Sequence, residues 1–186
     1  MKLAAKELVP NSIIRLLRPL LLTGVIMGTP LLLAGETPHH HPAPAKLVQA
    51  VREATQQYID VNNAGPDYVP LFGCVSGPDH GAMGIHYLNL SLVVDGEIDE
   101  LRPEALIYEP AGNRRKLVGV EYIVDSATWL GSHPLPPQLE GQAFQFVDSP
   151  NRYGIPPFFE LHVWAWRDNP NGAFVDWNNN VSCEGQ

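Results

Sequence analysis

The sequence predicts an α+β domain in which an N-terminal helix packs on a curved, mainly antiparallel β-sheet or partial barrel. Two observations indicate this. One amphipathic helical pattern comes first, and short β-type runs follow it, separated by clusters of Gly, Pro, Asn and Asp. Because no helical crossover lies between the later runs, most neighbouring strands should be antiparallel. A two-sheet sandwich with the helix at its periphery is the alternative fold.

One helix and five strands are expected. The helix should run from about Lys46 to Asn62, where apolar residues recur on one stripe until Asn63-Ala64-Gly65-Pro66 ends the pattern. The strands are expected at Met83–Val94, Ala105–Tyr108, Leu117–Val124, Phe144–Val147 and Phe158–Trp166. None of these five runs contains a proline, as expected for paired strands. Residues 46–186 therefore read as a single globular domain.

The first 34 residues have the parts of a secretory signal peptide. Basic residues come first, at Lys2, Lys6, Arg15 and Arg18. An uncharged apolar run from Pro19 to Ala34 follows, with small residues at Ala34–Gly35. An uncleaved signal anchor is the alternative, although Pro30 interrupts a run that is short for a bilayer span. We therefore expect an exported protein of the periplasm, the cell envelope or the outside, with a His/Pro-rich linker at residues 35–45.

The net charge limits the classes of binding partner, and the cysteine content indicates a disulfide. Without residues 1–34 the chain keeps eight basic and 19 acidic residues, a net charge of −11. Such a protein repels phosphate backbones, so nucleic acid and anionic lipid are poor partners, while a small molecule or a metal ion fits better. Cys74 and Cys183 are the only cysteines, and in an oxidising compartment such a pair most often forms a disulfide. Two unpaired buried thiols are the alternative.

The last expected strand has an unusual polar face. Alternation places Phe159, Leu161, Val163 and Ala165 on one side and Phe158, Glu160, His162, Trp164 and Trp166 on the other. Aromatic residues mixed with Glu and His are typical of a cavity wall. Glu160 and His162 should lie about 7 Å apart along this side, so both side chains can approach one point.

Further ligands can come from other strands. His80 and His86 flank a glycine-containing run, and Glu121 is a charged residue in the middle of an apolar strand, which is costly unless the charge is paired or metal-bound. Imidazole and carboxylate groups bind zinc, copper or iron in open sites. We therefore predict a divalent transition-metal site. Its candidate ligands are His86, His162, Glu160, His80 and Glu121, beside a pocket lined by Phe158, Trp164 and Trp166.

Several alternatives stay open. His86 and His162 could be hydrogen-bonded sheet residues, with Glu160 paired to Arg102 or Arg152. The pocket could bind a small apolar or aromatic ligand without catalysis, or the domain could be a structural module of the envelope. The oxygen-rich segment Arg167–Cys183 could hold calcium, but it lacks the spacing of an EF-hand loop, which favours an ordinary hydrogen-bonded loop.

Four blocks of sequence carry a resemblance. CVSGPDHGAMGIHYLN, RPEALIYEP, LVGVEYIV and HVWAWRDNPNGAF…WNNNVSC resemble an uncharacterised family of secreted bacterial proteins, from about Thr55 to Cys183. The resemblance implies export and a single domain. It carries no activity, so catalysis is neither predicted nor excluded.

Overall fold

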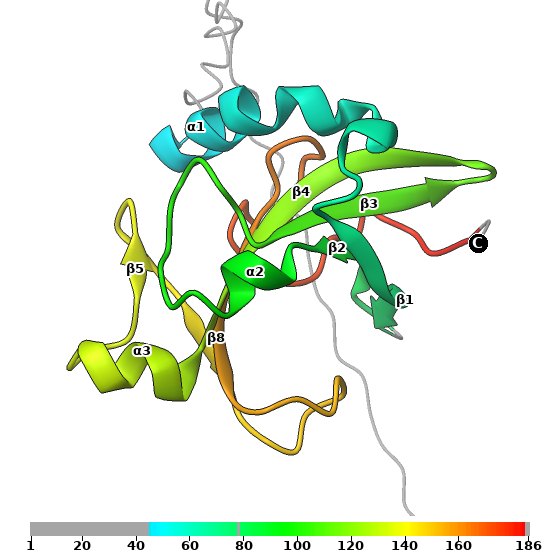
Figure 1. Ribbon diagram of the computed structural model, residues 1–186. Coiled ribbons are helices and arrows are strands. Elements are labelled where there is room, and N and C mark those ends of the chain that lie inside the picture. Colours follow the sequence, from blue (N-terminus) through cyan, green and yellow to red (C-terminus); the bar gives the residue numbers. More distant parts are fainter. Residues whose placement is uncertain (1–44, 78, 185–186) are drawn as a thin grey trace, which may run out of the picture. The chain divides into compact units, whose positions relative to one another are not determined.

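A curled six-stranded antiparallel sheet forms the centre of the domain, as a half-barrel with a few helices around it (Figure 1). The computed structural model describes residues 45–77 and 79–184. The expected signal peptide at 1–34, and the linker up to residue 44, lie outside the described residues. The strand order is β1-β2-β3-β4-β8-β7. The strands are β1 (Val69–Gly77), β2 (Gly81–Leu88), β3 (Ala105–Ala111), β4 (Arg114–Asp125), β7 (Gln145–Val147) and β8 (Phe158–Val163). The α+β prediction is confirmed.

The amphipathic segment packs its apolar stripe on one face of the sheet. Helix α1 (Lys46–Thr55) buries Leu47, Val48 and Val51 in the main core. The predicted helix ended near Asn62, but the α-helix stops at Thr55 and continues as two 3₁₀ turns, η1 (Gln56–Ile59) and η2 (Val61–Asn63). The Thr55 hydroxyl donates to the Val51 carbonyl, a back-bond that is unfavourable for a straight α-helix.

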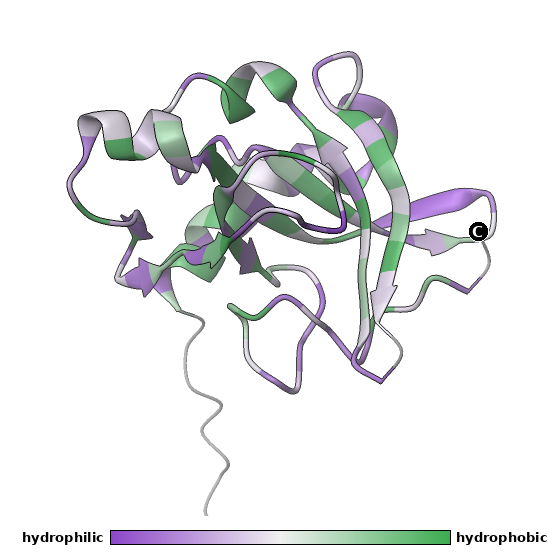
Figure 2. Cartoon of the chain, turned by 90° about the horizontal axis from the view of Figure 1, so that it is seen from below, coloured by the Kyte–Doolittle hydropathy of each residue, from purple (hydrophilic) through white to green (hydrophobic). Residues whose placement is uncertain are grey.

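Strand alternation separates two faces of the sheet. The face toward α1 carries the main core, which includes Tyr108, Tyr122, Phe159 and Leu161. The other face carries two smaller apolar clusters. One contains Ala82, Ile107, Val118, Trp164 and Val181, and the other contains Leu88, Ala105, Ile123 and Phe158. Figure 2 shows hydrophobic bands along the strands and hydrophilic residues along many of the connections.

Several elements differ from the prediction. The strand expected at Met83–Val94 ends at Leu88, because Asn89 caps the short helix α2 (Leu90–Val93) by accepting from the Ser91 amide. Helix α3 (Ser126–Ser132) was not anticipated and begins where the Asp125 side chain accepts from the Thr128 amide. Strand β1 was not anticipated either. The alternative sandwich would need a second large sheet. The described residues instead form a separate two-stranded ribbon, β5 (Gln138–Leu139) with β6 (Gln142–Ala143).

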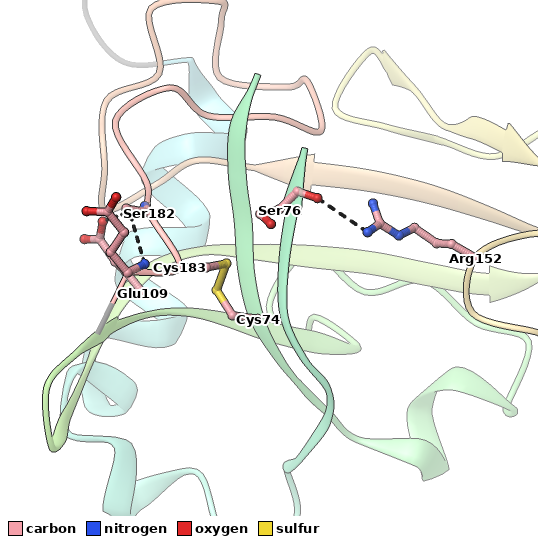
Figure 3. The surroundings of a disulfide bond; sticks show 7 residues. Cys74, Ser76, Glu109, Arg152, Ser182 and Cys183 are labelled. Atoms are coloured by element: carbon pink, nitrogen blue, oxygen red, sulfur yellow. Dashed lines mark hydrogen bonds between the residues drawn. A yellow bond between two sulfur atoms is a disulfide. The ribbon is translucent and has the colours of Figure 1, made fainter. Parts of the chain in front are cut away.

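The C-terminal segment after β8 folds back over the edge of the sheet. Asn178 forms an isolated antiparallel bridge with Ala82 of β2. Cys74 and Cys183 are joined by a disulfide across 109 positions, which confirms the predicted pairing (Figure 3). Beside the disulfide, the Ser182 amide donates to a carboxylate oxygen of Glu109. Among residues 45–77 and 79–184, no helix is long and apolar enough to cross a membrane.

Candidate metal centre

Four polar side chains are buried in the sheet face opposite α1. His86, Glu121, Glu160 and His162 are each at most 4% exposed. They lie on the same face as the two smaller apolar clusters, and Phe158 and Trp164 flank the Glu160–His162 pair along the β8 segment. Buried ionisable groups are costly unless they are paired, hydrogen-bonded or bound to a metal. We refer to these four residues as the His/Glu cluster.

The strand register brings the cluster together. Glu121 of β4 pairs directly with His162 of β8, and Ile123 pairs with Glu160. His86 of β2 pairs with Ile107 of β3, which pairs with Gly119 of β4. Residues two apart on a strand share a face, so Glu121 and Gly119 point to the same side. The curl of the sheet then lets His86 reach Glu121 across the intervening strand β3.

The distances within the cluster suit a single cation. His86 Nε2 lies 3.2 Å from one carboxylate oxygen of Glu121, and His162 Nε2 lies 4.0 Å from the other. One ligand atom from each of these three residues lies within 4.8 Å of the other two. Two donors bound to one tetrahedral zinc ion stand roughly 3.4 Å apart, given bonds of about 2.1 Å. The three side chains therefore need only small adjustments to hold a metal.

A second carboxylate reaches His162 from the other side. Asp176, in the segment after β8, places Oδ1 3.5 Å from His162 Nδ1, and Gln145 of β7 donates to the same oxygen. Glu160, His162 and Asp176 form a second group of potential ligands within 4.8 Å. A metal-binding histidine usually directs its other ring nitrogen to a carboxylate, which fixes the orientation of the ring. Asp176 lies in that position relative to His162 Nδ1.

Several buried polar atoms of the cluster have no hydrogen-bond partner among the described residues. They are His86 Nδ1, Glu160 Oε2 and both ring nitrogens of His162. Asp176 is close to His162 Nδ1, but the pair does not have hydrogen-bond geometry. An unsatisfied buried donor or acceptor costs about 1–3 kcal/mol, so four of them in one cluster require an explanation. Atoms such as His162 Nε2 and Glu160 Oε2 are also the donors that a metal would use.

The two buried carboxyl groups have opposite pKa shifts. Burial raises the pKa of Glu160 to about 10, and the charge of Glu121 acts in the same direction. For Glu121, burial would also raise the pKa, but the positive charges of His162 and His86 outweigh it and lower the pKa to about 2. For His162, burial lowers the pKa, while Glu121 and Asp176 more than offset that effect, so the pKa is raised. Glu121 is therefore the ionised carboxylate of the cluster, and Glu160 keeps its proton.

The structure brings four of the five predicted ligands together. His80 is exposed at the end of the β1–β2 hairpin, where it lines a surface hollow with Asp176 and is not a member of the cluster. The alternative ion pairs of Glu160 are not formed. Arg102 binds Asp99, and Arg152 donates to the Ser76 carbonyl.

The three predicted pocket aromatics are in three different places. Phe158 lines a cavity beside His86. Trp164 fills an apolar cluster, with its ring stacked 6.1 Å from that of His162. Trp166 packs against the core on the α1 side and donates to Thr55, so its predicted position on the His162 face is wrong. Strand β8 ends at Val163, and the Ala165 amide donates to the Val163 carbonyl, which breaks the alternation before Trp166.

Sequence reasoning missed the position of Asp176. It lies in the segment Arg167–Cys183, for which calcium was the only ligand considered, because nothing in the local pattern of that segment links Asp176 to a strand. The fold and the cluster define a class of protein: a small, disulfide-linked α+β domain with a buried histidine–carboxylate centre.

Comparison with known protein families, curated proteins and solved structures found no match to this chain. The resemblance to a secreted bacterial family therefore stays a prediction.

Proposed function

We propose that this chain binds one divalent transition metal through His86 Nε2, His162 Nε2 and a carboxylate oxygen of Glu121. The observation that carries the proposal is the convergence of three ligand-type side chains, each at most 4% exposed, within 4.8 Å. Two histidines and one carboxylate are a ligand set of catalytic zinc and of non-haem iron, and imidazole also suits copper. Zinc, copper and iron are therefore the metals to test.

Polar atoms without hydrogen-bond partners, together with the charge of Glu121, support a bound metal over a hydrogen-bonded network. A network should satisfy its own polar atoms, whereas both ring nitrogens of His162 lack a hydrogen-bond partner among the described residues. A divalent cation would neutralise Glu121 and take up His162 Nε2, while Asp176 would orient the ring through Nδ1. Glu160, two residues before His162 on β8, would keep its proton and stay outside the set of three ligands.

Three protein ligands leave at least one position on the metal open. Sites that keep an open position are typical of metal-dependent enzymes, while closed four-ligand sites are structural. The domain would then act as a metal-handling protein or as a small metal-dependent enzyme. Binding of an aromatic ligand in a pocket of three aromatic residues has less support, because Phe158, Trp164 and Trp166 do not line one pocket.

Metal analysis of the exported protein tests the proposal. His39, His40 and His41 are first replaced by alanine, because three adjacent histidines bind transition metals by themselves. We expect close to one metal per chain by mass spectrometry, and almost none in His86→Ala or His162→Ala. His133→Ala is the matched control, since this exposed histidine stacks on Trp129 away from the cluster and should keep full occupancy.

Thermal unfolding supplies a second readout. A saturating metal that binds only the folded state stabilises it by about 4 kcal/mol at 1,000 times Kd. We expect zinc, copper or iron to raise the Tm of the tail-substituted protein and to leave His162→Ala unchanged. Metal-free protein whose Tm responds to none of the three metals would show the proposal to be wrong.

We also propose that the domain works outside the cytoplasm. The disulfide is compatible with an oxidising compartment, and residues 1–34 have the composition of a signal peptide. N-terminal sequencing of protein secreted from a bacterial host should give a start close to Gly35. A mature chain that begins at Met1 would contradict export by cleavage.

A further inference from the structure

A cavity of about 50 Å³ adjoins the His/Glu cluster. His86 and Glu121 form its polar wall. Its remaining lining comes from strands, from α2 and from the loop before β8, and consists of Phe72, Leu88, Val93, Ile123, Tyr153, Ile155 and Phe158. The Tyr153 hydroxyl is directed to Met83 Sδ at 3.5 Å. An apolar cavity with a few convergent polar groups has the composition of a ligand site.

The size and lining of the cavity restrict what can enter. A bound water needs about 10–15 Å³ of cavity volume, so a cavity of about 50 Å³ has room for roughly three to five water-sized groups. A charged ligand group would lose its hydration against apolar walls, and an anionic group would also be repelled by the carboxylate of Glu121. A small uncharged molecule therefore fits best.

An irregular strand places an aromatic side chain at the cavity. The register of β1 against β2 shifts between Leu71 and Cys74, and Leu71 is the residue paired with His86. The extra residues, Phe72 and Gly73, both have a φ of 65°. A positive φ is uncommon for a bulky residue, and such strained positions concentrate at functional sites. Bulges next to active sites re-aim a side chain, and here Phe72 lines the cavity that contains His86.

Phe72 meets an aromatic residue from the opposite wall. Its ring centroid lies 5.3 Å from that of Tyr153, with the rings tilted by 55°. Phe72 is 50% exposed, while Tyr153 is half-buried, so the pair stands between the cavity and solvent. Tyr153 also contacts the Phe158 ring, deeper in the cavity.

We propose that this cavity is the ligand site of the metal centre, and that it takes a small, uncharged, mainly apolar molecule of about three to five non-hydrogen atoms with one metal-binding donor. The Phe72–Tyr153 pair sets the upper size limit. The inference rests on the proposed function, because the ligand's donor atom would occupy the open position of the metal held by His86, Glu121 and His162.

A series of alkanethiols added to the cobalt(II)-loaded full chain tests the size limit. Each thiol enters uncharged, releases its proton to buffer on coordination, and adds a sulfur-to-cobalt absorption band. Affinity should rise about fourfold per methylene from methanethiol to propanethiol, as expected for apolar burial. Hexanethiol should bind at least tenfold more weakly than propanethiol, because its chain does not fit.

Two variants separate the cavity from general effects. Phe72→Ala should strengthen hexanethiol binding at least tenfold and leave methanethiol unchanged. Ile155→Phe should fill the cavity and abolish propanethiol binding while cobalt uptake persists. Phe146→Ala is the matched control, because Phe146 is a similarly exposed phenylalanine outside the cavity lining and should change neither affinity.

Xenon added to the metal-free full chain probes the cavity without the metal. We expect chemical-shift changes around Leu88 and Ile123 that disappear in Ile155→Phe, because dry apolar cavities bind xenon. If cobalt binds but thiol affinity does not depend on chain length, the cavity inference is overturned and the metal site stands. If xenon binds but no metal does, the proposed function fails, and with it the assignment of a metal-binding ligand. Loss of both responses overturns both.

Discussion

Glu121 and His162 are direct partners in the β4–β8 ladder, with a carboxylate oxygen of Glu121 4.0 Å from His162 Nε2. Backbone pairing on adjacent strands therefore fixes the two side chains on one face, where directly opposite residues have their Cβ atoms about 5 Å apart. The other ring nitrogen of His162 faces Asp176, which comes from an irregular segment. Strand geometry defines one side of the histidine, and the C-terminal segment defines the other.

Asp176→Asn should weaken metal binding without removing the site. Losing the carboxylate that faces His162 Nδ1 removes the group that orients the ring, and such changes typically cost 10–100-fold in metal affinity. Competition titration with a chelator should show this loss, with occupancy still near one metal at saturation. Asp168→Asn, an exposed change in the same segment, should leave the affinity unchanged. Equal affinities in the two variants would remove Asp176 from the site.

The raised pKa of Glu104 predicts that the protein loses stability as the pH rises from about 4.5 to 8. Burial raises the pKa of this carboxyl to about 8, and one of its oxygens accepts from the Ile123 amide. Above pH 4.5 the unfolded chain loses this proton, while the folded chain keeps it until about pH 8. Rising pH therefore favours unfolding, by a few kcal/mol in total. The contribution of Glu104 to this loss should begin near pH 4.5 and level off above about pH 8.

Glu104→Gln mimics the protonated acid and should flatten this dependence. Urea unfolding at several pH values measures it, and the variant should gain stability relative to the parent as pH rises from 5 to 8. Glu97→Gln, at an exposed position, should follow the parent. A variant curve parallel to that of the parent would show that Glu104 does not titrate in this range.

Removing the disulfide should lower the stability of the domain substantially. The Cys74–Cys183 link spans 109 positions, and closing a loop of that length restricts the unfolded chain by about 4–5 kcal/mol. Urea unfolding of a Cys74→Ser/Cys183→Ser double variant should show a much lower midpoint. Parent protein with its disulfide reduced should resemble the double variant. A midpoint that reduction does not change would contradict the prediction.

Gly81 and Gly112 form a matched pair for a steric prediction. Both have positive φ, of 79° and 61°, so alanine is strained at either position. A Cβ at Gly81 would lie 2.1 Å from the Asn178 carbonyl oxygen, whereas a Cβ at Gly112 meets nothing within 4 Å. Gly81→Ala should therefore destabilise the protein by several kcal/mol more than Gly112→Ala, because the Ala82–Asn178 bridge must open. Similar unfolding midpoints would show that the C-terminal segment does not pack closely here.

Strand periodicity was sufficient to predict most of the His/Glu cluster. Glu160 and His162 alternate with apolar residues along β8, and Glu121 is a charged residue within an apolar strand, so each was recognisable without a structure. The failures occur where the backbone leaves regular geometry. Trp166 was misplaced because the chain turns after Val163. Asp176 was not linked to His162, because an irregular segment has no periodicity from which to infer a contact.

Local turn chemistry also explains why some helices and strands could not be predicted from the sequence. Strand β1 contains Pro70 and the Phe72–Gly73 irregularity, and both weaken a strand signal. Helix α3 is only seven residues long, too short to show a helical period, although Asp125 and Thr128 carry a capping signal. His80 was grouped with His86 by sequence proximity, but His80 lies in the exposed turn before β2, whereas His86 is buried within the strand.

The disulfide imposes an order on the assembly of the protein. A chain that emerges N-terminus first presents Cys74 long before Cys183, so the cross-link cannot form until residue 183 is available. The residues that complete the surroundings of His162, namely Trp164 and Asp176, also arrive in this final stretch. A chain that is still being synthesised would hold His86 and Glu121 without them. Loading of the proposed metal site would therefore be a late event, and a nascent or truncated chain should not compete for the ion.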